Sequence, residues 1–364
     1  ELSNVHVHTI NRDTDERYQL ILGDESINVY GLDGTAYTTA NNKIDTPDGV
    51  TYLDSSNPKA DFKTVTIADY TFIVNTSKTV AMDTAVSQGS GTAAIVFINQ
   101  VTANTEYTLE VNDRKCVYDT GTSNLNTTYI AGKLKNGLTD NEADVTETGP
   151  GLSGFTITQN GCVLWIRKTD GSAFTIDVSD SQGSSQITLV KGSVQTFSDL
   201  PTVAPNNFVV EVKGDESTNF DNYYVKFVTN NGESLEEGQW EETLKPGITY
   251  KIDEATMPHV LIRKADGDFL FAKADGASYT SAPNSTTYYI PTWKDRTVGD
   301  LDTAPSPSFI GSKINNVIFF RNRLGFLADD NVILSRVSEF FNFFPETVTT
   351  VIDSDPIDVA ASHT

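Results

Sequence analysis

The chain has 364 residues, more than one ordinary domain needs, and its 38% apolar content is sufficient for real hydrophobic cores. Its 49 Asp and Glu against 26 Lys and Arg give a formal net charge of −23. This charge argues against a protein that grips DNA, because such proteins hold the phosphates with basic side chains. The simplest interpretation of the charge is a well-solvated surface.

Cysteine content and the absence of hydrophobic spans set further limits. Cys116 and Cys162 are the only cysteines, and neither belongs to a CxxC or Cys/His metal pattern. Two buried thiols are therefore expected, although a disulfide stays possible. No stretch of about 18 apolar residues and no secretory start are present, so neither a membrane span nor a signal peptide is predicted. The chain begins without Met and stops in mid-pattern, so we expect a portion of a longer protein.

Residues 1–83 form the first β-rich segment that the sequence predicts. Short apolar or alternating runs at 5–10, 17–22, 26–30, 64–67 and 70–74 are separated by close-set turns such as Asp33-Gly34. Strand groups of this spacing occur in propeller blades, sandwiches and barrels. We favour blades, because the strand–turn–strand rhythm at 64–82 returns at 318–336.

The segment 84–193 changes character and is predicted to be an inserted small α+β domain. A small, polar linker at 83–92 precedes strand-like runs, and residues 129–137 fit a short helix. Asn160-Gly161 and Asp170-Gly171 are strong hairpin turns. Residues 194–364 are predicted to return to the first fold, with a surface arm or an extended connection at 276–308. The predicted fold class is mainly β: a propeller-like β-sheet core with the inserted α+β domain.

Basic and acidic side chains near the C-terminal hairpins are the candidate site residues. Arg321 and Arg323 are two apart on a strand-like run, which would place them on one face. They could contact a subunit interface or a phosphate, or form an ion pair across the hairpin with Asp329 or Asp330. The acidic stretch at 353–358 could form a solvated turn or pair with Arg321, Arg323 or Arg336. These five residues are therefore candidates for an interface or structural salt bridges.

Other polar clusters favour ordinary structural roles. His6 and His8 share a strand face but have no third ligand nearby, and His259 fits a satisfied sheet histidine. Asp353, Asp355 and Asp358 could hold Ca²⁺, but they lack the spacing of a calcium loop. We therefore predict no metal and no cofactor.

The aromatic block Phe340, Phe341, Phe343 and Phe344 fits one side of a short helix, which favours core packing over an exposed patch. No GxSxG, HExxH, P-loop or GxGxxG pattern is present, so no catalytic residue is predicted.

Four long segments resemble a known family. They are, in chain order, INRDTDERYQLIL, TVTIADYTFIVN, ATMPHVLIRKADGDF and NRLGFLADDNVILSRVSEFFNFFP, the last followed by DSDPIDVA. They resemble the tail tubular protein B, or tail nozzle, family of short-tailed phages. The resemblance is weakest from about residue 78 to 192.

The resemblance implies a structural, non-enzymatic virion protein, assembled in the bacterial cytoplasm, that forms the distal nozzle of a short tail and a conduit for genome ejection. It implies a ring of six copies that contacts a tubular adaptor protein and tail fibres. Double-stranded DNA would pass through the lumen without specific binding. A tail-tip glycan-binding or glycan-hydrolysing module stays as the alternative, since tail tips meet polysaccharide.

Overall fold

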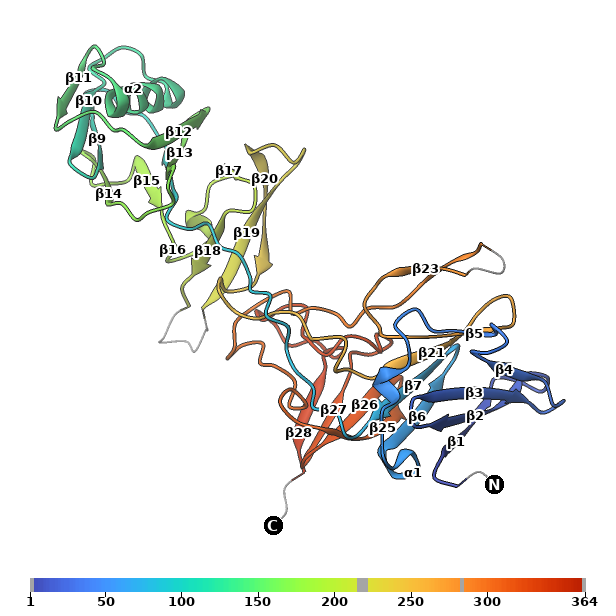
Figure 1. The fold of residues 1–364 in the computed structure, drawn as a ribbon. Helices are drawn as coiled ribbons and strands as arrows, with labels where there is room; N and C mark the ends of the chain where they lie inside the picture. The colour runs from blue at the N-terminus through green and yellow to red at the C-terminus, as the bar shows by residue number, and fades with distance from the viewer. Residues whose placement is uncertain (1–2, 215–221, 282–284, 362–364) are drawn as a thin grey trace. The chain divides into compact units, whose positions relative to one another are not determined.

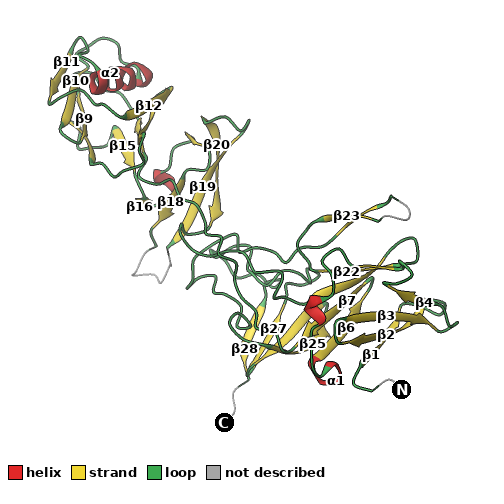
Figure 2. Cartoon of the chain, in the orientation of Figure 1, coloured by secondary structure: helices red, strands yellow, loops and turns green. Residues whose placement is uncertain are grey.

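The computed structural model describes residues 3–214, 222–281 and 285–361, and most of its regular structure is β-strand (Figures 1 and 2). The prediction of a mainly β protein is confirmed. The chain forms two compact units. Unit 1 comprises Glu1–Val86, Thr249–Thr297 and Ala304–Thr364, and unit 2 comprises Ser87–Ile248 and Val298–Thr303.

Unit 1 contains two four-stranded antiparallel meanders. The first has the strand order β1-β2-β3-β4, with bounds β1 (His6–Asn11), β2 (Arg17–Gly23), β3 (Ser26–Gly31) and β4 (Ala36–Thr38). The second has the order β25-β26-β27-β28, with bounds β25 (Ile314–Phe320), β26 (Arg323–Ala328), β27 (Asn331–Leu334) and β28 (Ile357–Ala360). Consecutive strands pair in both sheets because tight turns join most of them.

A five-stranded sheet joins the parts of unit 1 that precede and follow unit 2 in the sequence. Its order is β5-β22-β21-β7-β6, with bounds β5 (Ile44–Asp45), β22 (Phe269–Ala272), β21 (His259–Arg263), β7 (Tyr70–Asn75) and β6 (Phe62–Ile67). The pairing of His259 with Ile73 brings together residues 186 positions apart in sequence. Smaller elements are the hairpin β23 (Ser278–Thr280) and β24 (Thr287–Tyr289), helix α1 (Pro58–Asp61) and the 3₁₀ turn Thr51–Leu53.

The main core of unit 1 is aromatic. Phe72, Trp293, Phe309 and Phe326 are at most 2% exposed and belong to one cluster. Trp293 lies in the segment expected to be a surface arm or an extended connection. The first alternative is wrong for this part, because Trp293 packs against Phe72 and Phe326. Arg296 is also buried and donates to the backbone oxygen of Thr249 at 2.8 Å.

Unit 2 contains three sheets and one longer helix. The first sheet has the order β11-β10-β9-β14: β9 (Glu106–Val111), β10 (Arg114–Asp119), β11 (Val145–Thr148) and β14 (Ile176–Asp180). The second has the order β12-β13-β8-β15: β8 (Ala94–Ile98), β12 (Phe155–Asn160), β13 (Val163–Lys168) and β15 (Ile187–Val190). The third has the order β16-β18-β19-β20-β17: β16 (Ser193–Val194), β17 (Val203–Pro205), β18 (Val209–Val212), β19 (Tyr223–Thr229) and β20 (Leu235–Thr243), with the 3₁₀ turn Phe197–Asp199 after β16.

The helix expected at 129–137 is confirmed as α2 (Thr127–Thr139). The side chain of Asn126 accepts a hydrogen bond from the backbone N–H of Tyr129, as a helix N-cap does. Ile130, Leu134 and Leu138 are buried on its inner face, and the 3.6-residue repeat of a helix explains their spacing.

The sequence-based boundary at residue 193 falls inside unit 2. β16 pairs in parallel with β18, and Val163 of β13 shares a hydrophobic cluster with Val210 and Phe227. This shared core explains why residues 193–243 belong to unit 2. Val298–Thr303 also returns to it: the Gly299 N–H donates to Thr243 O, and the Lys245 N–H donates to Gly299 O. The described helices include none that is both long and apolar enough to cross a membrane.

Candidate functional site

Two tight turns determine where the candidate site residues lie. Arg321 and Asn322 form the turn between β25 and β26, with φ values of 48° and 59°. Asp329 and Asp330 form the turn between β26 and β27. Since β26 has six residues, the two turns are about 20 Å apart at roughly 3.3 Å per residue. The sequence predicted an ion pair across the hairpin, between either arginine and either aspartate. The described residues form no such pair.

Arg321 and Arg323 do not share a face, because Arg321 belongs to the turn and Arg323 begins β26. Arg321 is exposed, and its guanidinium lies 5.4 Å from the centre of the Phe320 ring. Asp329 accepts a hydrogen bond from the Ser312 hydroxyl at 2.6 Å. The backbone oxygen of Asp330 accepts a hydrogen bond from the Ala361 N–H at 2.7 Å.

Arg323 is 6% exposed. Its guanidinium holds a loop in place by donating hydrogen bonds to neutral backbone oxygens. Its Nη1 donates to the backbone oxygens of Ser335 and Asp355, both at 2.6 Å. Its Nη2 donates to the backbone oxygen of Asp353 at 2.8 Å. A buried cation that makes several charge-assisted hydrogen bonds is typical of a structural cross-link. Arg323 thus ties β26 to the loop that precedes β28.

Arg336 is 3% exposed and holds the other end of the same loop. Its Nη1 lies 2.6 Å from a carboxylate oxygen of Glu339, and its Nη2 lies 2.7 Å from one of Glu346. Burial acts to lower the pKa of Arg336, but the hydrogen bond to Glu346 and the nearby carboxylates outweigh it and raise the pKa. We call Arg323, Arg336 and the loop at 346–355 the arginine clasp.

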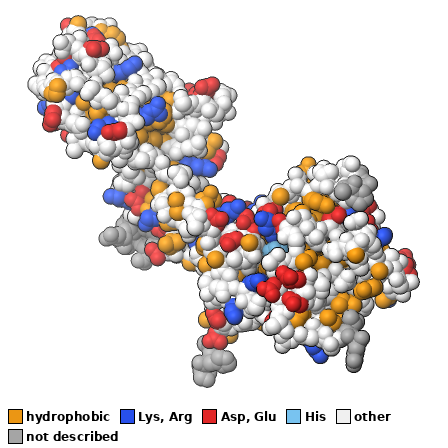
Figure 3. Space-filling model, viewed as in Figure 1, with side chains coloured by type: hydrophobic (Ala, Val, Ile, Leu, Met, Phe, Trp, Pro, Cys, Tyr) orange, Lys and Arg blue, Asp and Glu red, His pale blue; other side chains and the backbone are white. Residues whose placement is uncertain are grey.

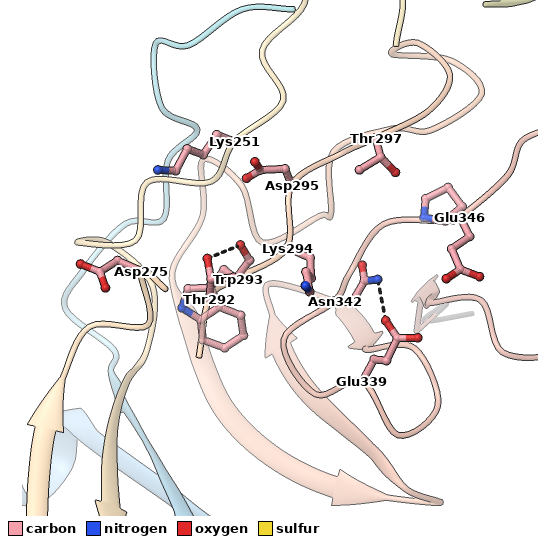
Figure 4. A pocket seen from close by; sticks show the side chains of 11 residues that line it. Lys251, Asp275, Thr292, Trp293, Lys294, Asp295, Thr297, Glu339, Asn342 and Glu346 are labelled. Carbon is pink, nitrogen blue, oxygen red and sulfur yellow. Dashed lines mark hydrogen bonds between the residues drawn. The ribbon is translucent and has the colours of Figure 1, made fainter. Parts of the chain in front are cut away.

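An open pocket of about 580 Å³ lies beside the arginine clasp in unit 1 (Figure 4). Glu339 lines it and accepts a hydrogen bond from the Asn342 amide at 3.0 Å. Asp295 also lines it, and burial raises the pKa of this carboxyl. The other lining side chains are Lys251, Asp275, Thr292, Trp293, Lys294, Thr297, Pro345 and Glu346.

The chemistry of this pocket fits a charged surface better than a catalytic centre. Lys251 is paired with Glu254 at 2.6 Å, and Glu339 and Glu346 are both paired with Arg336. General acid–base catalysis needs a positioned partner for the titrating group. Asp295 has a raised pKa, but no hydroxyl or thiol of the described residues donates a hydrogen bond to its carboxylate.

The histidines and C-terminal carboxylates have structural partners. Nε2 of His6 and Nε2 of His8 lie 2.9 Å and 2.8 Å from the hydroxyls of Thr64 and Thr66, which joins β1 to β6. A carboxylate oxygen of Asp358 accepts a hydrogen bond from the Ser308 N–H. Within residues 3–214, 222–281 and 285–361, no three His, Cys, Asp or Glu side chains are grouped as metal ligands. Cys116 and Cys162 are free thiols, and only Cys116 is fully buried.

Half of the aromatic block is core, as expected, whereas Phe340 and Phe341 are half-buried against that core, and the block is not a helix. Phe343 and Phe344 are at most 4% exposed, and Phe343 stacks on Phe326 with ring centres 5.1 Å apart. The chain instead makes turns here, with a β-bridge between Arg336 and Glu339. The ion pairs of Arg336 with Glu339 and Glu346 favour this turn over a helix.

The family to which the chain belongs follows from comparison with known sequences. A family described as "Bacteriophage nozzle protein" matches residues 1–364. The chain belongs to this family. Tail tubular protein gp12 of Escherichia phage T7 is 32% identical over 370 residues, a match that covers 98% of the chain and 42% of that relative.

The comparisons confirm the nozzle family that the sequence motifs resembled, and with it a structural tail protein. The chain spans about two fifths (42%) of the length of the curated relative it matches. Neither comparison supports the alternative of a glycan-binding or glycan-hydrolysing module.

Sequence reasoning missed the residues that line the pocket. Asp295 and Lys294 lie more than 40 positions from Glu339 and Asn342, and no local motif joins them. The clasp partners of Arg336 left a weak signal, because Glu339 and Glu346 follow it by three and ten positions.

Proposed function

We propose that this chain is part of the wall of the distal nozzle of a short phage tail, through which the genome is ejected into the host. The observation that carries this proposal is the match of the nozzle family along residues 1–364. A net charge of −23 suits such a wall, because a surface poor in cations has little affinity for the phosphates of passing DNA. Figure 3 shows acidic side chains grouped on the viewed face of unit 1.

The proposed core of the nozzle is propeller-like, with the two meanders β1–β4 and β25–β28 as blades. Four-stranded antiparallel blades in which consecutive strands pair are the repeating unit of propellers, and both meanders have this order. The inserted α+β domain, placed at 84–193 by the sequence, would be an addition to this core. Arg323 and Arg336, which are buried, would hold the loop that precedes the last strand of the second blade.

The proposed assembly is a ring of six copies in the virion tail, formed in the bacterial cytoplasm. It would contact a tubular adaptor protein above and tail fibres alongside, while double-stranded DNA passes without specific binding. These partners come from the family resemblance. The similarity to a tail tubular protein of a phage supports a place in a phage tail.

Negative-stain electron microscopy of the full-length protein mixed with its adaptor protein tests this function. Six-fold rings that stack on the adaptor into a tapered tube are the expected result. Monomers that do not bind the adaptor at any protein ratio would overturn the proposal. The adaptor alone and the full-length protein alone are the matched controls.

A further inference from the structure

An aromatic groove lies on unit 1 next to the turn between β25 and β26. The groove has a volume of about 590 Å³, and its apolar wall consists of Tyr70, Ile290, Pro291, Phe340 and Phe341. These residues come from segments far apart in sequence that the fold of unit 1 brings together. Their side chains offer a concave apolar surface of the kind that holds an anchor side chain of a partner.

Two exposed phenylalanines extend the groove outward. Phe319 and Phe320 at the end of β25 are 44% and 54% exposed. The ring of Phe319 meets that of Phe340 edge to face, with centres 5.7 Å apart. Exposed aromatic side chains that adjoin an apolar groove mark interaction sites on protein surfaces.

The turn beside the groove is held rigidly. The Ser338 N–H donates to the backbone oxygen of Asn322 at 2.9 Å, and the Asn322 amide donates to the Ser338 hydroxyl at 2.5 Å. Ser338 itself lines the groove. The exposed phenylalanines and the groove wall therefore form one continuous surface, which we call the docking surface.

The charges at the rim of this surface specify its partner. Lys294 lines the groove and Arg321 lies in the adjoining turn, and neither forms an ion pair within 4.0 Å in the part of the chain that the structure describes. The carboxylate of Glu339 at the rim is already engaged by Arg336 and Asn342. On a chain with a net charge of −23, this rim places two exposed cations without a close ion pair next to apolar surface. Complementary charge on a partner would therefore be negative.

We propose that the docking surface binds a segment of a different protein in which an aromatic or leucine side chain stands between acidic residues. The apolar side chain fills the aromatic groove, and the flanking carboxylates contact Lys294 and Arg321. That the different protein is another tail component rests on the proposed function, whereas the chemistry of the segment does not.

Photo-cross-linking in assembled phage particles tests this proposal. Full-length protein carrying Phe320→p-benzoylphenylalanine is irradiated, and the joined peptides are identified by mass spectrometry. The same photoreactive residue in place of Tyr30, an aromatic residue on β3 that is 38% exposed and does not line the groove, is the control. The expected product joins position 320 to a peptide of a different protein that carries an aromatic or leucine residue flanked by Asp or Glu.

The rim charges are tested with a second change in the same particles. Lys294→Glu is expected to lower the cross-link yield at position 320 by about three- to fivefold, the size of one exposed ion pair, whereas Lys294→Arg keeps it. A product with a second copy of this chain, a joined peptide without acidic residues, or a yield no higher than at position 30 would each overturn the proposal. Six-fold rings without the expected cross-link would refute the docking surface and leave the nozzle standing. The expected cross-link without six-fold rings would support the docking surface and refute the proposed nozzle.

Discussion

Replacing Arg323 by methionine removes the cation of the arginine clasp while keeping a similar apolar length. Four backbone oxygens, those at positions 335, 353, 354 and 355, then lose a donor, and Ser335 has no exposed surface. Leaving a buried acceptor unsatisfied costs about 1–3 kcal/mol. The oxygens of Asp353 and Asp355 are only partly buried, so water can replace part of their loss. We therefore expect Arg323→Met to lower the free energy of unfolding of unit 1 by about 3 kcal/mol.

Urea denaturation followed by tryptophan fluorescence measures this change. Trp293 belongs to unit 1, whereas Trp165 and Trp240 belong to unit 2. In a background with both unit 2 tryptophans replaced by phenylalanine, the signal reports unit 1 alone. Arg321→Met is the matched control, since Arg321 is exposed in a turn and should change stability by no more than about 0.5 kcal/mol. Equal losses for the two variants would refute the structural role given to Arg323.

Three further predictions concern packing, pH and thiol reactivity. Gly325→Ala should lower stability by about 1–3 kcal/mol, because the new methyl group would meet Leu334 at 2.6 Å, and urea midpoints will measure the loss. Burial lowers the pKa of His259 to about 4. Between pH 6.5 and pH 4, His259 is therefore protonated in the unfolded chain but neutral in the folded chain. Stability should therefore fall by about 2 kcal/mol from pH 7 to pH 5, and His259→Phe should remove that share of the fall. Burial raises the pKa of the Cys116 thiol to about 11. A thiol reagent at pH 8 should therefore label Cys162 first in the native protein, and both thiols only in urea. Reducing the protein beforehand should not change the labelling, because both thiols are free.

Local signals in the sequence predicted the strands and turns well. Asp33-Gly34 and Asn160-Gly161 marked hairpins correctly, because glycine adopts positive φ at little cost. The hairpin predicted at Asp170-Gly171 is wrong, because this turn joins β13 to β14, which lie in different sheets. The turn at Arg321-Asn322 escaped because only Asn322 favours positive φ, whereas the strand pairing of Phe320 with Arg323 imposes this conformation on Arg321. Reading both arginines as strand residues then placed them on one face and suggested the wrong ion partners.

Long-range partners were beyond the reach of a single sequence. The acceptors of Arg323 are backbone oxygens 12 to 32 positions away, and backbone groups leave no mark in the sequence. The parallel pairing of β16 with β18 likewise depends on a core shared with Val163. The sequence shows a change of composition at residue 84, close to where unit 2 begins. The position where unit 2 ends has no such mark in the sequence, because it depends on side-chain packing.

The return of Val298–Thr303 to unit 2 has a consequence for recombination between related phages. The polypeptide passes from one unit to the other four times, at 86/87, 248/249, 297/298 and 303/304. A crossover that exchanges only 87–248 would leave Gly299 of one parent against Thr243 and Lys245 of the other. Backbone hydrogen bonds tolerate such a mixture, whereas the ion pair of Lys245 with Asp300, 3.8 Å apart, depends on both parents carrying suitable side chains. Unit 2 is therefore inherited most safely as two separate stretches of the gene that travel together.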